Sequence, residues 1–478
     1  MKKSLVLVGV IAAVAAAYTG VSWYVGMRSE ETVRTAIERA NDRIVKTMGP
    51  ETGTLRARIE ISEYRRGVFS SQARYTIVVN DSDDRYEFGM DDHMQHGPFP
   101  WALVRQGSFA PLLAYSRSQL VDTETVKRWF DAARGAMPLN VDTRIGFGGK
   151  GASTWTFAPL EWSVEQDLLS FSGGRTEVRF SNEFRDSTAQ GHFASLVMGG
   201  GADGDRVSLN DIRLSSQTAM ADDEAVQVDS KLEVAALVIQ DNADENLKLE
   251  NISATLKSRQ KAALLDASLR YDFERVWVGE IDLGSMSLGG EVARFDLESF
   301  SALAAEYDAI ASEHGAENDE DFDLTPQDEE RLMARLAPVL ASSPAVALRP
   351  VIWRNEKGES TLSAAAAFQP LPAGAAANAE NSIESALKEM RFELVISRPM
   401  LLQAFAQTGD GEAEKQQLEM LAALMYDRYV SELEQQGLVR REGERAFISI
   451  VYVDGSFDVN GQALSLEEFM SLFGAFFM

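Results

Sequence analysis

Residues 55–62, with the sequence LRARIEIS, decide the fold of the region that follows them. Leucine, alanine and isoleucine occupy every second position, and charged or polar residues stand between them. Successive side chains of a β-strand point to opposite faces, so this period of two predicts a strand with one buried and one solvated face. Residues 71–80 form a second, β-branched run, and the Arg66-Gly67 step before it permits a turn. The two runs therefore predict consecutive strands.

Short alternating segments continue from about residue 140 to residue 296, separated by glycine and by Asn/Asp turns. No helical pattern lies between them, so they predict antiparallel pairing rather than βαβ units. Near the C-terminus, Asp454-Gly455 predicts a hairpin, and Ser465 with Glu468 predicts the capping box of a last helix. Apolar stripes predict further helices at residues 31–48, 111–135, 297–314, 325–337, 400–406 and 412–436.

Residues 4–25, SLVLVGVIAAVAAAYTGVSWYV, contain no charged side chain and predict a transmembrane helix. At ~1.5 Å per residue, a run of about 22 residues spans roughly the hydrocarbon core of a bilayer. Lys2 and Lys3 resist translocation and predict a cytoplasmic N-terminus, while Trp23 and Tyr24 suit the distal membrane interface. The alternative is a signal peptide cleaved near residues 15–17, although the apolar run is longer than a usual signal core.

These patterns predict an α+β fold, with a single N-terminal transmembrane helix followed by an elongated, largely antiparallel β-rich domain with covering helices. The predicted regions are a cytoplasmic N-terminus (1–3), a transmembrane anchor (4–26), a β-rich exported region (27–296) and a mixed helical and strand exported region (297–478). No second apolar run approaches spanning length, so a single span is expected.

The chain is acidic, with 73 Asp and Glu against 46 Lys and Arg and a net charge of −27. A duplex-binding surface needs a basic stripe, so this composition argues against a nucleic-acid partner and against broad adhesion to anionic lipid heads. The chain has no cysteine, which excludes disulfides, thiol nucleophiles and cysteine metal sites. With 478 residues and 45% hydrophobic content, it is long enough for two or three subdomains.

Residues 146–151, GFGGKG, have the spacing of a dinucleotide-binding loop, but a strand rather than a helix is predicted after them, so a glycine-rich β-turn is expected. His93 and His96, beside Asp91 and Asp92, would share a metal only on one helical face. The following Gly-Pro-Phe-Pro breaks a helix, so an extended loop with a structural His96 is predicted. No nucleophile elbow, HExxH or kinase signature occurs, and no catalytic residue, metal or cofactor is predicted.

Short matches to a known family run in order along almost the whole chain. They are KSLV (3–6), YRRGVFSSQ (64–72), HGPFP (96–100), RIG (144–146), FSGG (171–174), WRN (353–355), GES (358–360), NGQ (460–462) and SLEEF (465–469). In these stretches the chain resembles the YdgA-like proteins of Gram-negative bacteria, a family of unknown function. The motif residues singled out are Arg66, Gly67, Phe69, Ser70, His96, Gly97, Pro98, Phe99 and Pro100. Their glycine, proline and aromatic content indicates structural turns and packing rather than an active centre.

The resemblance implies an inner-membrane anchor, a periplasmic location for residues 27–296 and 297–478, and self-association as a homodimer. We therefore expect a non-enzymatic envelope protein that acts as a scaffold or binding module, with the membrane, a lipid or an envelope protein as partner. The alternative is a lipid-binding or lipid-transfer protein with a β-sheet groove, which a continuous apolar trough would support and a filled core would oppose. A hydrolase would need carboxylates that converge in a cleft with perturbed pKa values, and a fully packed His96 would count against it.

Overall fold

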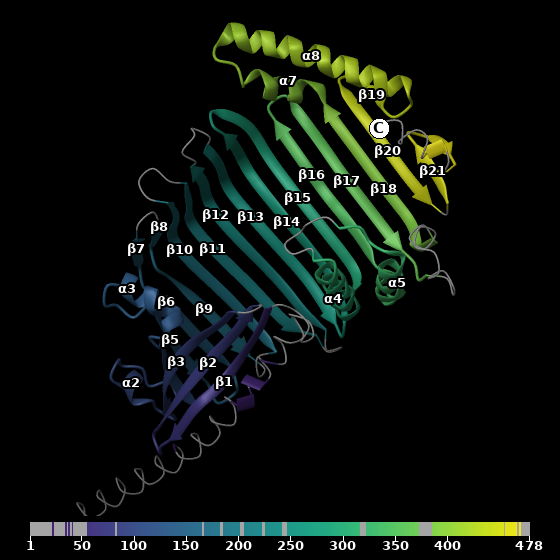
Figure 1. The fold of residues 1–478 in the computed structure, drawn as a ribbon. Helices are drawn as coiled ribbons and strands as arrows, with labels where there is room; N and C mark the ends of the chain where they lie inside the picture. The colour runs from purple at the N-terminus through teal and green to yellow at the C-terminus, as the bar shows by residue number, and fades with distance from the viewer. Residues whose placement is uncertain are drawn as a thin grey trace, which may run out of the picture. The chain divides into compact units, whose positions relative to one another are not determined.

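The structure is a computed structural model that describes residues 22, 34–35, 37–38, 41, 55–81, 84–164, 167–181, 185–200, 205–221, 225–240, 246–315, 322–371, 385–453, 455–465 and 468–469. It divides into two compact units, one made of Met1–Ala202 with Asn210–Met220 and the other of Asp203–Leu209 with Ala221–Met478. Antiparallel strands dominate both units and helices are few, which confirms the predicted β-rich class (Figure 1). The predicted transmembrane helix, residues 4–26, lies outside the described residues except for Ser22.

Ten strands of the first unit pair antiparallel in the order β1-β2-β3-β4-β5-β6-β9-β10-β8-β7. Their bounds are β1 (Leu55–Arg66), β2 (Ser70–Asp81), β3 (Asp84–His96), β4 (Ala114–Leu120), β5 (Leu139–Ile145), β6 (Gly151–Phe157), β7 (Leu160–Val164), β8 (Asp167–Phe171), β9 (Gly174–Ser181) and β10 (Asp186–Gly200). The strands predicted at residues 55–62 and 71–80 are thus confirmed as β1 and β2. Strand β11 (Arg206–Met220) contributes residues to both units.

The helix predicted at residues 111–135 is wrong over its first half, which forms strand β4. β4 pairs with β3 on one edge and β5 on the other, and its Ala114, Tyr115 and Leu120 are buried. Pairing on both edges satisfies its backbone groups and overrides local helix preference. Helical structure is confined to η1 (Glu124–Val126) and α3 (Lys127–Ala132), and a short helix α2 (Trp101–Val104) precedes β4.

The glycine-rich segment at residues 146–151 is a turn between β5 and β6, as predicted. The Gly149 amide donates to the Gly146 carbonyl at 3.1 Å, and the Gly146 amide donates to the Lys150 carbonyl at 2.8 Å. Gly149 has a φ of 75°, a conformation in which glycine pays no Cβ penalty. No helix follows the turn, so a dinucleotide loop does not form there.

The second unit is a meander of long antiparallel strands, in the order β12-β13-β14-β15-β16-β17-β18-β20. Both β19 and β21 pair with β20, and β22 pairs with β21. The bounds are β12 (Val226–Gln240), β13 (Asn246–Lys261), β14 (Leu264–Val278), β15 (Ile281–Asp296), β16 (Ala345–Asn355), β17 (Gly358–Phe368), β18 (Leu387–Ser397), β19 (Arg440–Glu442), β20 (Arg445–Val453), β21 (Ser456–Val459) and β22 (Gln462–Leu464). The hairpin predicted around residues 454–455 is confirmed by the β20–β21 pairing.

Two helix pairs interrupt this meander. Helices α4 (Leu297–Glu313) and α5 (Pro326–Ala341) connect β15 to β16, and α7 (Arg398–Ala406) and α8 (Glu412–Gln435) connect β18 to β19 (Figure 1). All four were predicted, but α5 runs through Pro338 to Ala341, because buried Val339 and Leu340 offset the backbone bond that proline cannot make. Among the described helices, none combines the length and the apolar composition needed to cross a bilayer.

Candidate functional site

The motif residues from two separate stretches of the first unit come together at one end of β1, β2 and β3. Arg66, Gly67, Phe69 and Ser70 form the turn between β1 and β2, and His96 ends β3. The Gly67 amide donates to the Ser70 carbonyl at 2.7 Å, and the His96 amide donates to the Phe69 carbonyl at 2.9 Å. The first residue of HGPFP is therefore hydrogen-bonded to the β1–β2 turn.

His96 is buried, with 1% of its surface exposed, and both ring nitrogens are hydrogen-bonded. Nδ1 lies 3.0 Å from the Val68 carbonyl, which only accepts, so Nδ1 carries the proton. Nε2 then accepts from the Ser71 hydroxyl at 2.8 Å. Burial lowers the pKa of His96, although the bond to Val68 raises it. We call His96, Ser71, Val68 and Phe69 the His96 cluster.

Gly97, Pro98 and Pro100 extend this packed region, and the Gly97–Pro98 peptide bond is cis. The Gly97 amide donates to the Leu113 carbonyl at 2.8 Å, and the Leu112 amide donates to the Pro98 carbonyl at 2.9 Å. A Cβ on Gly97 would lie 1.7 Å from the Leu112 carbonyl oxygen, so only glycine fits. Pro100 is buried, whereas Phe99 is 41% exposed.

Asp92 lies four residues before His96 on β3, and three hydroxyls donate to its buried carboxylate. Oδ1 accepts from Ser116 and, at 2.9 Å, from Ser118, and Oδ2 accepts from Tyr75 at 3.3 Å. Burial raises the pKa of Asp92, and the three hydroxyl bonds lower it. The carboxylate is thus held by side chains of the neighbouring strands β2 and β4.

This arrangement does not suit proton transfer or metal binding. Neither nitrogen of His96 is left for a substrate, and its packing counts against the hydrolase hypothesis. His93 and His96 lie at odd and even positions of β3, so their side chains point to opposite faces of the sheet. They cannot share an ion, and no group of three metal-ligating side chains occurs within the described ranges.

The second unit carries a different feature, an apolar sheet face. Registered pairing across β13 to β20 places one residue from each strand in a continuous row. That row consists of Leu256, Leu269, Gly290, Leu348, Ala364, Phe392 and Ile450. A neighbouring row on the same face consists of Ala267, Val292, Val346, Ala366, Met390 and Tyr452. We call the surface made by these two rows and their same-face neighbours the apolar face.

Much of the apolar face is accessible to solvent. Leu256, Leu269 and Leu348 are 39%, 38% and 39% exposed. Further large apolar side chains that are more than a third exposed on this face are Leu232, Tyr271, Leu288 and Val346. At the β20 end, by contrast, Ile450 and Tyr452 are buried in a cluster with Phe457 and Val459. Contiguous exposed apolar side chains often mark a binding surface, so the apolar face is a candidate for one.

The opposite face of the same strands is charged. Ion pairs join positions two apart on one strand, which share a face: Lys231–Glu233 at 2.6 Å, Arg270–Asp272 at 2.7 Å and Arg391–Glu389 at 2.6 Å. The hydrogen bond from Arg270 lowers the pKa of Asp272. Because these pairs are exposed, they add little stability, but they keep this face solvated.

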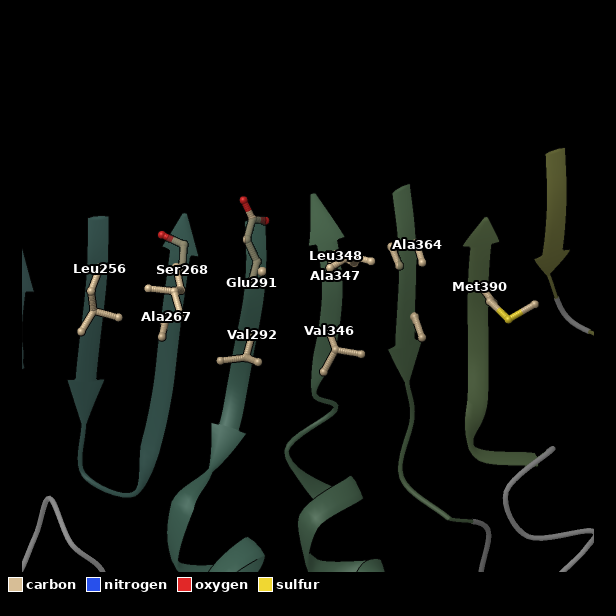
Figure 2. A pocket seen from close by; sticks show the side chains of 14 residues that line it. Leu256, Ala267, Ser268, Glu291, Val292, Val346, Ala347, Leu348, Ala364 and Met390 are labelled. Carbon is tan, nitrogen blue, oxygen red and sulfur yellow. The ribbon is translucent and has the colours of Figure 1, made fainter. Parts of the chain in front are cut away.

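A hollow of about 560 Å³ lies on the apolar face, within the range of ligand pockets. Figure 2 shows its lining side chains on six neighbouring strands, β13 to β18. The small residues Gly290, Ala364 and Ala366 leave the space that larger side chains would fill. The apolar lining comprises Leu256, Ala267, Leu269, Gly290, Val292, Val346, Ala347, Leu348, Ala364, Ala365, Ala366 and Met390. Ser268 and Glu291 complete the lining, at positions where alternation directs the side chain to the charged face.

The other predicted site residues, Lys2, Lys3, Trp23 and Tyr24, lie outside the described residues. Within the predicted span, Ser22 is described and buried, and its hydroxyl donates to the Gly97 carbonyl at 2.7 Å. Residue 22 of the predicted span therefore contacts the HGPFP motif.

The model of a bacterial family of unknown function, DUF945, matches residues 1–467. Protein YdgA of Escherichia coli strain K12 is 26% identical over 502 aligned residues, which cover 99% of this chain and 97% of that protein. The uncharacterized protein YihF of the same strain is 22% identical over 491 residues, covering 98% of each chain. An uncharacterized protein of Haemophilus influenzae is 25% identical over 171 residues, 36% of this chain and 46% of that protein. No solved structure matches the chain.

Proposed function

Because the chain belongs to the DUF945 family of bacterial proteins of unknown function, no relative's activity guides an assignment, and we propose from the geometry that it binds lipid hydrocarbon chains on the apolar face. The predicted resemblance to the YdgA-like family is confirmed by this membership. The observation that supports the proposal is the apolar face, with its exposed leucines and its hollow, opposite a face that carries ion pairs. Transfer of apolar surface from water to hydrocarbon drives such binding.

A hydrocarbon chain fits this face better than an extended peptide does. Each strand from β13 to β18 already pairs on both edges, so a peptide cannot add as a further strand there. The two apolar rows across β13 to β18 also offer no side-chain hydrogen bond to a peptide backbone, whose polar groups would be costly to bury. A hydrocarbon chain needs no such partner.

In this proposal the chain is a non-enzymatic binding module of the bacterial envelope. Residues 4–26 anchor it in the inner membrane with a cytoplasmic N-terminus, and both units work in the periplasm beside a source of lipid. A second copy or an envelope protein remains a predicted partner. The proposal combines two predictions made from the sequence. The binding module is a lipid-binding protein, and its β-sheet groove is the hollow on the apolar face.

A matched pair of substitutions on one strand tests the proposal. Leu256 lines the hollow, and the adjacent Thr255 points to the charged face, opposite Arg270 in the register. Leu256→Glu places a carboxylate against bound hydrocarbon, whereas Thr255→Glu places the same group in solvent beside a cation. We expect Leu256→Glu to lower the amount of retained phospholipid by about tenfold or more, since an unpaired charge is costly in an apolar site.

The measurement is mass spectrometry of lipids extracted from the gently solubilised full-length chain, per mole of protein. Thr255→Glu is expected to retain as much phospholipid as the unaltered chain. Equal retention by all three proteins would place lipid elsewhere, and absence of lipid from the unaltered chain would refute the proposal. Circular dichroism of each variant checks that the sheet is intact.

A further inference from the structure

A second apolar hollow, of about 540 Å³, lies between α4 and α5 in the same unit. Its apolar lining is Phe300, Leu303, Ala304, Tyr307, Leu324, Leu332, Met333 and Leu336. The polar lining residues are Asp308 and Glu329, and no basic residue lines it. We call it the α4–α5 hollow.

Ion pairs join the two helices that form the α4–α5 hollow. Arg331 of α5 donates to Glu306 and to Glu313 of α4, each at 2.8 Å, and Arg335 reaches Glu306 at 3.1 Å. At the start of α5, the Asp328 carboxylate accepts from Thr325 and lies 2.9 Å from His314 Nε2. A site formed in advance loses less conformational entropy when it binds.

The α4–α5 hollow adjoins the apolar face at the end of β15. Phe295 faces Leu265 in the register and therefore lies on the apolar face. Its ring centroid is 4.8 Å from that of Phe300, which lines the α4–α5 hollow. Val292, three residues before Phe295, lines the hollow on the sheet. The contact between Phe295 and Phe300 thus joins the β15 end of the apolar face to the α4–α5 hollow.

We infer that the α4–α5 hollow receives the end of a hydrocarbon chain whose lipid lies on the apolar face, so that the two hollows bind one molecule. This inference rests on the proposed function. Asp308 and Glu329 disfavour an anionic group near the α4–α5 hollow, so the lipid enters with its hydrocarbon end and keeps its phosphate away. A neutral or zwitterionic phospholipid fits this arrangement.

Photo-crosslinking tests the inference with vesicles of phosphatidylethanolamine that carries a diazirine at the end of one acyl chain. Peptide mapping then locates the adducts on the full-length chain. Ala304→Trp fills the α4–α5 hollow with an apolar ring, and Ala309→Trp adds the same ring to an exposed alanine of α4 outside that lining. Since five residues correspond to about 140° around the helix, the two rings point in different directions.

We expect adducts on α4 or α5 in the unaltered chain, a loss of about fivefold or more of those adducts in Ala304→Trp, and no loss in Ala309→Trp. Adducts on β13 to β18 should persist in both variants. Adducts confined to the sheet would overturn this inference and leave the proposed function standing. Adducts on neither region would overturn both, and a protein retained at α4 and α5 in place of lipid would overturn this inference.

Discussion

The His96 cluster of the first unit and the apolar face of the second unit differ in how completely their side chains are packed and hydrogen-bonded. In the His96 cluster every ring nitrogen has a partner, and there is no room for one added carbon at Gly97. On the apolar face, leucines remain more than a third exposed beside a hollow of about 560 Å³. A closely packed cluster stabilises the fold. Apolar surface that is still exposed to water can instead gain free energy when a ligand covers it.

The difference also shows that the most distinctive sequence motif need not be the ligand-binding site. The stretch HGPFP carries the family resemblance most visibly, but its residues pack a turn. The apolar face is built from strands that are individually ordinary, and its binding character appears only when the rows align.

Gly97→Ala is expected to have the largest effect. The new Cβ would lie 1.7 Å from the Leu112 carbonyl oxygen, which is backbone and cannot turn aside. We expect the first unit to lose about 3 kcal/mol or more of its free energy of unfolding. Urea unfolding followed by circular dichroism measures this loss.

Gly148→Ala is the control within the same unit, because nothing lies within 4 Å of a Cβ placed there. Its effect should stay within about 0.5 kcal/mol. Equal stability of the two variants would show that the HGPFP stretch is not packed as described.

Gly290→Val makes the same kind of change on the apolar face and should act in the opposite direction. A Cβ there meets only the Ala347 carbonyl oxygen, at 4.0 Å, and the side chain would project into the hollow. We expect stability to rise by about 0.5–1 kcal/mol, because glycine weakens a strand, and phospholipid retention to fall several-fold. A lower free energy of unfolding together with unchanged lipid retention would show that the apolar face is packed at Gly290, as the first unit is at Gly97.

Acidification should destabilise the first unit through His96. Burial lowers the pKa of His96 below its usual 6.5, so unfolding takes up a proton as the pH drops through that range. The contribution of His96 is complete above about pH 6.5 and declines below it. Asp92 acts in the opposite sense, because burial raises its pKa and its protonated form is favoured in the fold.

His96→Gln isolates this effect, since its amide can also bond to the Ser71 hydroxyl and the Val68 carbonyl. The urea midpoint of the unaltered chain should fall more between pH 7 and pH 5 than that of the variant. Parallel pH profiles would show that His96 is accessible to protons in the folded state.

Arg270→Gln on the charged face should have the smallest effect. Its pair with Asp272 is exposed, so we expect a loss of less than about 1 kcal/mol of stability. Phospholipid retention should stay unchanged, because the side chain points away from the apolar face. A large loss of lipid would mean that ligand also occupies the charged face.

The sequence predicted much of this fold because its periodicities are local. The alternation at residues 55–62 predicts strand β1, and Thr325 with Pro326 predicts the start of α5, where the structure shows a capping box with Asp328. The local pattern of residues 111–135 favours a helix, because it does not reveal that β4 pairs with β3 and β5.

The apolar face could not be predicted for a related reason. Alternation in β13 shows that Leu256 and Thr255 occupy different faces, but not that Leu256 lies opposite Leu269 or that Gly290 continues the row. Alternation also predicts that the apolar side is buried, whereas here it is exposed. A signal was present in the successive apolar alternations of β12 to β16, because antiparallel neighbours of this kind share one apolar face.

The absence of cysteine allows the central claim to be tested at single positions. A nitroxide label is attached to Leu269→Cys on the apolar face and, separately, to Arg270→Cys on the charged face, and phosphatidylethanolamine is added. Electron paramagnetic resonance then measures label mobility and collision with a water-soluble nickel complex. We predict that lipid immobilises the label at position 269 and shields it from nickel, while position 270 is unaffected. Equal responses at both positions, or no response at position 269, would contradict lipid binding on the apolar face.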